Sequence, residues 1–233
     1  MPNISIENLL SAGAHFGHMT SSWNPNMRDF IFTQKNGVHI IDLNQTLSQL
    51  SKAIELVDQA VKNGGSVLFV GTKKTAKQVI VEEANRCNMF HVTERWLGGT
   101  LTNFITIKKS IKRLQQLEKE GIEGLKFALT KKEMLMRTRE KNRLEVQHRG
   151  IKEMRRLPNV IVVVDAKKEA IAVQEAKRLE IPVICMVDTN SDPRNIEIPI
   201  PANDDSIQTI RLIVSTLADT ILEAKGVSGN KED

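Results

Sequence analysis

The sequence contains no tyrosine, two tryptophans and seven phenylalanines among its 233 residues. Proteins that read single-stranded RNA commonly stack its bases on aromatic rings, often within RNP-type motifs. Because rings are scarce here and no such motif is present, we expect Trp23 and Trp96 to pack within the protein rather than on bases.

Long apolar runs are also missing. No stretch approaches the roughly eighteen consecutive apolar residues that indicate a transmembrane helix. Residues 1–5 have neither the basic nor the apolar region of a secretory signal,. We therefore expect a cytoplasmic protein with no membrane partner.

The chain has two cysteines, Cys87 and Cys185. Cys87 ends a helical pattern, Cys185 lies inside an apolar strand pattern, and the two show no metal-ligand spacing. Both are expected to be buried thiols in a reducing compartment, with no disulfide between them.

The usual nucleotide-binding motifs are absent as well. No GxGxxG occurs, and GxxxxGK[ST] cannot be aligned on the nearest candidate, Val70-Gly71-Thr72-Lys73-Lys74-Thr75,. A helix N-terminus beside two lysines can nevertheless hold a phosphate. Lys73 and Lys74 are candidate contacts to a nucleic-acid phosphate, the alternatives being plain surface lysines and a mononucleotide site.

Positive charge is concentrated in one segment. Residues 103–157 carry sixteen Lys and Arg against seven Glu and no Asp, a charge of +9, whereas the rest of the chain sums to −4. Such an excess on a helical stretch favours a polyanionic partner, and nucleic acid is the main candidate. The alternative is a solvated helix surface, which would not need so large an excess of one sign.

Three short apolar runs, at 66–70, 160–164 and 183–187, are each followed by a pattern of helical period,. Apolar strands of this kind are buried on both faces, and their alternation with helices predicts a parallel sheet. Weaker strands at 89–92 and 196–200 would bring the sheet to about five strands. The predicted fold class is α/β, with helices flanking the sheet.

Two appendages are expected. A β-hairpin is predicted at 30–41, where Lys35-Asn36-Gly37 suits a tight turn,. Within 103–157 the strand signals stop, and two helical arms are predicted, joined by a linker that Gly121 and Gly124 bracket. We thus expect a discontinuous α/β domain at 1–102 and 158–225, an inserted basic helical hairpin at 103–157, and a flexible tail at 226–233.

Histidines and aspartates form the remaining candidate site. His15 and His18 lack a nearby third metal ligand, so a structural role is favoured for them. Asp188, Asp204 and Asp205 could converge at the sheet edge and hold a divalent ion, but turn and helix-cap roles explain them as well,. We expect no metal, no cofactor and no catalytic residue.

Several blocks together resemble the bacterial small-subunit ribosomal protein S-two family over nearly the whole chain. They are Ala12-Gly13-Ala14-His15-Phe16-Gly17-His18, Trp23-Asn24-Pro25, 95–103 (RWLGGTLTN), Leu125 with Thr130-Lys131-Lys132-Glu133, 136–140 (MRTRE), 181–193 and 200–205 (IPANDD). The resemblance implies a flavodoxin-like domain with an inserted coiled-coil hairpin. It also implies binding to small-subunit (16S) ribosomal RNA between the head and body of the particle, and no catalysis or small-molecule substrate.

The resemblance further assigns roles to the basic residues and to partners. It implies RNA contacts by Lys73, Lys74, Arg95, Lys108, Lys109, Lys112, Arg113, Lys131, Lys132, Arg137 and Arg139. Neighbouring small-subunit proteins, including ribosomal protein S-one, are the implied protein partners, and no homo-oligomer is expected.

Two departures from the family pattern and two rival functions stay open. Asn26 and Gln45 stand where relatives commonly carry lysine, so any RNA contact there would depend on Arg28 and Lys52. The rivals are a nucleotide-dependent enzyme using the turn after Val70, and a helical module that binds an acidic protein.

Overall fold

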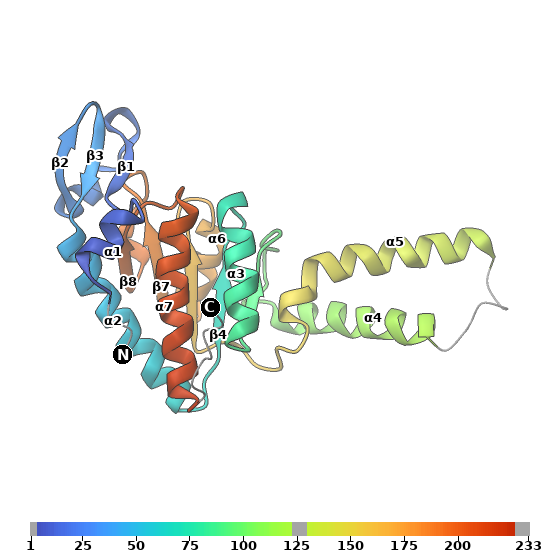
Figure 1. The fold of residues 1–233 in the computed structure, drawn as a ribbon. Helices are drawn as coiled ribbons and strands as arrows, with labels where there is room; N and C mark the ends of the chain where they lie inside the picture. The colour runs from blue at the N-terminus through green and yellow to red at the C-terminus, as the bar shows by residue number, and fades with distance from the viewer. Residues whose placement is uncertain (1–3, 123–129, 227–233) are drawn as a thin grey trace.

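The computed structural model describes residues 4–122 and 130–226 (Figure 1). Its main sheet contains the strands β4 (Val67–Val70), β5 (Phe90–Val92), β6 (Val160–Val164), β7 (Val183–Val187) and β8 (Ile198–Pro201). They lie in the order β5-β4-β6-β7-β8, and every neighbouring pair is parallel. Counted along the chain this is 2-1-3-4-5, the flavodoxin-like order, so the predicted fold class is confirmed.

Successive residues of each strand enter cores on opposite faces of the sheet. In β4, Val67 and Phe69 belong to one core cluster, whereas Leu68 and Val70 belong to the other. This alternation follows from the two-residue period of a strand, and it explains why the strands read as continuous apolar runs. The sequence signal therefore identified the sheet directly.

Helices cover both faces of the sheet (Figure 1). The first core cluster is completed by α2 (Leu43–Lys62), α3 (Lys74–Arg86) and α7 (Ile207–Ala224). The second is completed by α6 (Ala170–Arg178) and the first turns of α4 (Phe104–Ile122). Cys87 and Cys185 are buried free thiols, as expected.

A second, antiparallel sheet has the order β1-β3-β2. Its strands β2 (Ile31–Lys35) and β3 (Val38–Ile41) form the predicted hairpin, and Asn36 and Gly37 in the turn have φ of 52° and 76°. Strand β1 (Phe16–Met19) was not predicted, and α1 (Ile6–Ser11) precedes it. The small sheet lies at one end of α2, beside the carboxyl ends of the main strands (Figure 1).

Helices α4 and α5 (Lys131–His148) lie side by side and project away from the main sheet (Figure 1). Leu114 and Leu117 of α4 pack on Leu144 of α5, and a short 3₁₀ helix, η4 (Arg149–Ile151), returns the chain to the body. Helix α4 continues through Gly121, which we had placed in the linker, because it ends at Ile122. Gly124 and the predicted tail beyond Gly226 lie outside the described residues.

None of the described helices is both long and apolar enough to cross a membrane.

Candidate nucleic-acid interface

Helix α5 begins at the lysine pair that the sequence singled out. Thr130 Oγ1 accepts a hydrogen bond from the Glu133 backbone N–H, and the Glu133 carboxylate accepts one from the Thr130 N–H at 2.9 Å. This capping box satisfies two backbone donors and fixes the start of the helix. Lys131 and Lys132 therefore occupy its exposed first turn.

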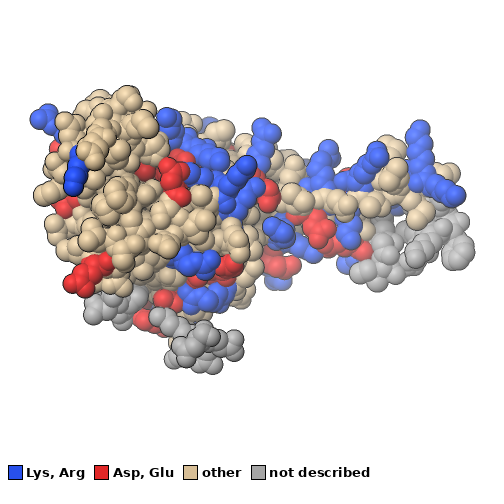
Figure 2. All heavy atoms as spheres, turned by 45° about the horizontal axis from the view of Figure 1, so that its top comes forward, with Lys and Arg blue, Asp and Glu red and all other residues tan. Residues whose placement is uncertain are grey.

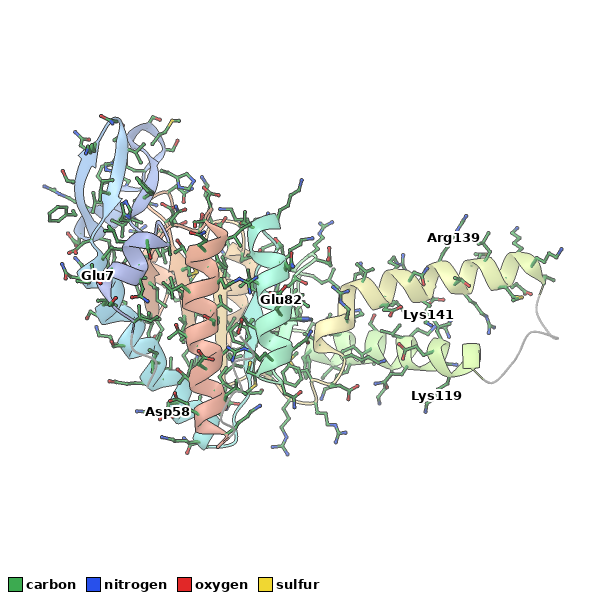
Figure 3. The ribbon with its side chains drawn as sticks, viewed as in Figure 1. Glu7, Asp58, Glu82, Lys119, Arg139 and Lys141 are labelled. Atoms are coloured by element: carbon green, nitrogen blue, oxygen red, sulfur yellow. The ribbon has the colours of Figure 1, made fainter. Side chains whose placement is uncertain are left out.

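The basic side chains of α5 continue on the side facing away from α4. Figure 3 shows Arg139 on this outer side and Lys141 on the side toward α4. Lys132, Arg139 and Arg143 recur at a spacing that keeps them on one helical side, and all three are exposed. We call Lys131, Lys132, Arg139 and Arg143 the basic face of α5.

Figure 2 shows Lys and Arg side chains along the whole projecting pair of helices. On α4, Lys109 and Lys112 are exposed, and Lys108 lies 4.7 Å above the centre of the Phe104 ring. Within the part of the chain that the structure describes, the basic face of α5, Lys109 and Lys112 form no ion pair with a carboxylate. These cations can accept phosphate without first losing a protein partner.

Arg113 has a different environment. Its Nε and Nη2 donate to the two carboxylate oxygens of Glu140, each at 3.1 Å, so the pair joins α4 to α5. A two-point contact of this geometry suits arginine and a carboxylate. The guanidinium lowers the pKa of Glu140 by hydrogen bonding, which keeps that carboxylate charged. Arg137 is only partly exposed and also has an interaction within the protein.

Lys73 lies at the switch point of the main sheet, between the carboxyl ends of β4 and β6,. Its Nζ is 2.5 Å from Asp204 Oδ1, 2.6 Å from Asp205 Oδ1 and 3.9 Å from Asp165 Oδ2, and its side chain is 18% exposed. Burial lowers the pKa of Lys73, but the hydrogen bonds to Asp204 and Asp205 outweigh it and leave the pKa raised. The structure thus places this ammonium against carboxylates, whereas the neighbouring Lys74 is exposed.

The loop that carries Arg95 is held by Glu175, a residue that the sequence did not single out. Glu175 Oε1 accepts from Trp96 Nε1 at 3.1 Å and from the Gly99 N–H at 2.7 Å. Its Oε2 accepts from the N–H groups of Leu101 and Thr102 at 3.0 and 3.1 Å, and from the Thr102 hydroxyl at 3.1 Å. A buried acidic residue on α6 therefore shapes the loop.

The two tryptophans are placed differently. Trp96 is buried and bonded to Glu175, which confirms the expectation that it packs within the protein. Trp23 is partly exposed, and the centre of its ring lies 5.1 Å from that of His39. Arg95, next to Trp96, is exposed at the surface of the loop.

The structure also brings together the acidic residues that the sequence left as a weak candidate. Asp188, Asp204 and Asp205 lie around His18, and one donor atom from each of the four falls within 4.8 Å of the others. Asp192 is apart from them, because it caps a short 3₁₀ helix and pairs with Arg194.

Comparison with known proteins gives a consistent result. The family model described as "Ribosomal protein S2" matches residues 9–224. The small ribosomal subunit protein uS2 of Acidobacterium capsulatum is 48% identical over 232 residues, which are 100% of this chain and 77% of that protein. The protein of the same name from Treponema pallidum is 47% identical over 231 residues, covering 99% of this chain and 79% of its own length.

Proposed function

Because the chain belongs to the ribosomal protein S2 family, a structural and non-enzymatic component of the small ribosomal subunit, we propose that it binds small-subunit ribosomal RNA mainly through the basic face of α5. Its location is then the small subunit, in the cytoplasm of a bacterial cell. The rival reading as a nucleotide-dependent enzyme is not in keeping with this family.

The observation that carries the proposal is the set of exposed cations without a carboxylate partner among the described residues. Lys131, Lys132 and Arg139 extend from a helix pair that projects from the body, where a polyanion can approach them (Figures 2 and 3). Neutralising phosphates with such side chains releases condensed counterions, which makes binding favourable and dependent on salt. Lys109, Lys112 and Lys108 on α4 would add contacts of the same kind.

A second contact would come from the α/β body. Arg95 and Lys74 are both exposed at loops near the carboxyl ends of the main strands,. The bonds that Glu175 makes to the 96–102 segment would keep Arg95 in one place. Two RNA contacts on one protein would fix the relative positions of two RNA segments, which we assign to the junction of head and body. Lys73 is the weakest member of the predicted contact set, because it is already paired.

We also propose that neighbouring ribosomal proteins, including ribosomal protein S-one, dock near the N-terminal sheet. Met19 of β1 and Phe32 of β2 are large apolar side chains that are mostly exposed in the monomer. Apolar side chains exposed together are typical of protein interaction sites. We expect Met19→Ser with Phe32→Ser to reduce the amount of S-one that sediments with small subunits while leaving this chain bound to them. An unchanged S-one content would contradict this docking site.

The function as a whole is tested by sedimentation of a cell lysate through sucrose gradients at moderate and high salt. We expect the chain to migrate with small subunits and to be released progressively as salt rises. Migration as a free monomer at every salt concentration would contradict the proposal.

Charge reversal tests the basic face itself. We expect Lys131→Glu with Lys132→Glu to weaken binding to small subunits stripped of this protein by roughly tenfold or more, because two phosphate contacts become repulsive. The salt dependence of the binding constant should fall by about two contacts. The circular dichroism spectrum should stay unchanged, since both side chains are exposed.

The matched control is Lys35→Glu with Lys62→Glu, which makes the same change of charge on the α/β body. Both lysines are exposed and lie outside the proposed contact set. If both double variants bind equally well, the hairpin is not the RNA-binding element. If the Lys131 and Lys132 variant loses an acidic protein but keeps RNA, the helical-module alternative holds instead.

A further inference from the structure

The group of His18, Asp188, Asp204 and Asp205 draws on three separate parts of the chain. His18 comes from β1 of the small sheet, Asp188 follows β7 of the main sheet, and the last two lie in the loop between β8 and α7. The carboxyl ends of parallel strands form the edge of the sheet where open α/β folds commonly bind ligands. The group therefore lies at a favourable position, and it links the two sheets.

The donor atoms face one another closely. His18 Nδ1 lies 3.0 Å from Asp188 Oδ2, and His18 Nε2 lies 3.6 Å from Asp205 Oδ2. The other oxygen of Asp188 is held by the N–H and hydroxyl of Thr189, at 2.5 and 3.2 Å. The backbone N–H of His18 donates to Thr189 Oγ1 at 2.9 Å, so β1 is fixed beside the end of β7. The arrangement is held from several sides.

The carboxylates outnumber the cations that face them. Asp188 and Asp204 are each 1% exposed, and Asp165 and Asp205 complete four acidic groups around the ammonium of Lys73. Asp204 Oδ1 accepts from Lys73, whereas Oδ2 is buried with no hydrogen-bond partner among the described residues. Burial raises the pKa of Asp204 to about 6, because the low-polarity surroundings disfavour its charge. Buried charges in proteins are ordinarily paired or coordinate metals, and here half of one carboxylate is not paired.

We propose that His18, Asp188, Asp204 and Asp205 bind a divalent transition-metal ion of the Mn²⁺ or Zn²⁺ class. Carboxylate oxygens alone would suit Mg²⁺, but an imidazole nitrogen in the set favours Mn²⁺ or Zn²⁺. Lys73 hydrogen-bonds Asp204 and Asp205 through their other oxygens and would hold these ligands in place,. The ion would tie β1 to the main sheet, a role independent of RNA binding.

Mn²⁺ binding to the full-length chain tests the site. The protein is stripped with EDTA and titrated with Mn²⁺, and free Mn²⁺ is followed by electron paramagnetic resonance. We expect one ion per chain, displaced by Zn²⁺. Asp205→Asn should weaken binding at least about tenfold, and because the Asp205 side chain is 60% exposed the variant should keep its fold. Asp58→Asn, which removes a carboxylate from α2 far from the group (Figure 3), should bind like the unchanged chain.

His18→Gln supplies the second variant and a readout of the ligand itself. Bound Mn²⁺ should show magnetic coupling to an imidazole nitrogen in the unchanged protein, and this coupling should vanish in His18→Gln. Absence of saturable binding at millimolar Mn²⁺ would overturn the proposal and leave Lys73 as the resident cation. Equal affinity in Asp205→Asn and Asp58→Asn, or a nitrogen signal that persists in His18→Gln, would overturn it as well.

Discussion

Replacing Glu175 with alanine is expected to lower the free energy of unfolding by about 3 kcal/mol or more. Glu175 is 8% exposed and accepts hydrogen bonds from Trp96, Gly99, Leu101 and Thr102. Alanine would leave these donors without an acceptor, at a cost of about 1–3 kcal/mol for each donor that stays buried. Chemical denaturation followed by tryptophan fluorescence measures the loss, because Trp96 reports on the loop directly.

Glu175→Gln is the matched variant, since it keeps the shape and removes the charge. Its amide nitrogen would replace one of the two accepting oxygens and face N–H donors, so we expect a smaller loss than with alanine. Burial raises the pKa of Glu175, but the hydrogen bonds from Thr102, Leu101, Trp96 and Gly99 outweigh it and leave the pKa below its ordinary value of 4.5.

The lowered pKa sets the expected pH dependence. A group with a depressed pKa in the folded state stabilises the protein above its ordinary pKa, and this stabilisation is lost as the pH falls through the folded value. The stability of the unchanged protein should therefore fall below about pH 4.5 more steeply than that of Glu175→Gln,. Equal stability of Glu175→Ala and the unchanged protein would show that the loop does not depend on this carboxylate.

Much of the fold could be predicted because its signals are local. The parallel strands are short apolar runs, and the hairpin turn has residues that accept positive φ,. Strand β1 gave no such signal: it has four residues, includes Gly17, and pairs with β3 in an interrupted register. Its placement depends on contacts with Thr189, more than 170 residues away.

The candidate site was less predictable, because the partner of a charged side chain is set by the tertiary fold. Lys73 looked like a free lysine at a helix start, yet its partner Asp204 is 131 residues away. Arg113 looked like the other cations of α4, and only the rotation of α4 against α5 brings Glu140 to it. Glu175 looked like a solvated charge on a helix for the same reason. Net charge located the basic segment, but it could not separate the free cations from the paired ones.

Gly150→Ala is expected to destabilise the protein by about 3 kcal/mol, the upper end of the usual cost of overpacking. Gly150 lies in η4, where the chain returns from α5 to the body. A methyl group on its Cα would overlap the imidazole ring and the backbone carbonyl oxygen of His91 in β5. Burial lowers the pKa of His91 to about 4, so the ring is neutral at pH 7 and packs there as an uncharged group. The ring could rotate away, but the carbonyl belongs to the sheet and cannot.

The consequence should reach the proposed RNA contact, because η4 joins the basic face of α5 to the sheet. Gly98→Ala is the matched control: Gly98 has open space where a methyl group would stand, and we expect nearly unchanged stability. In Gly150→Ala with His91→Ala, removing the ring should restore only part of the lost stability, since the overlap with the carbonyl oxygen remains. Denaturation curves measure the stability, and binding to stripped small subunits measures the displacement of α5. If Gly150→Ala is as stable as Gly98→Ala, then η4 is free to shift on β5, and the helix pair is not rigidly joined to the sheet.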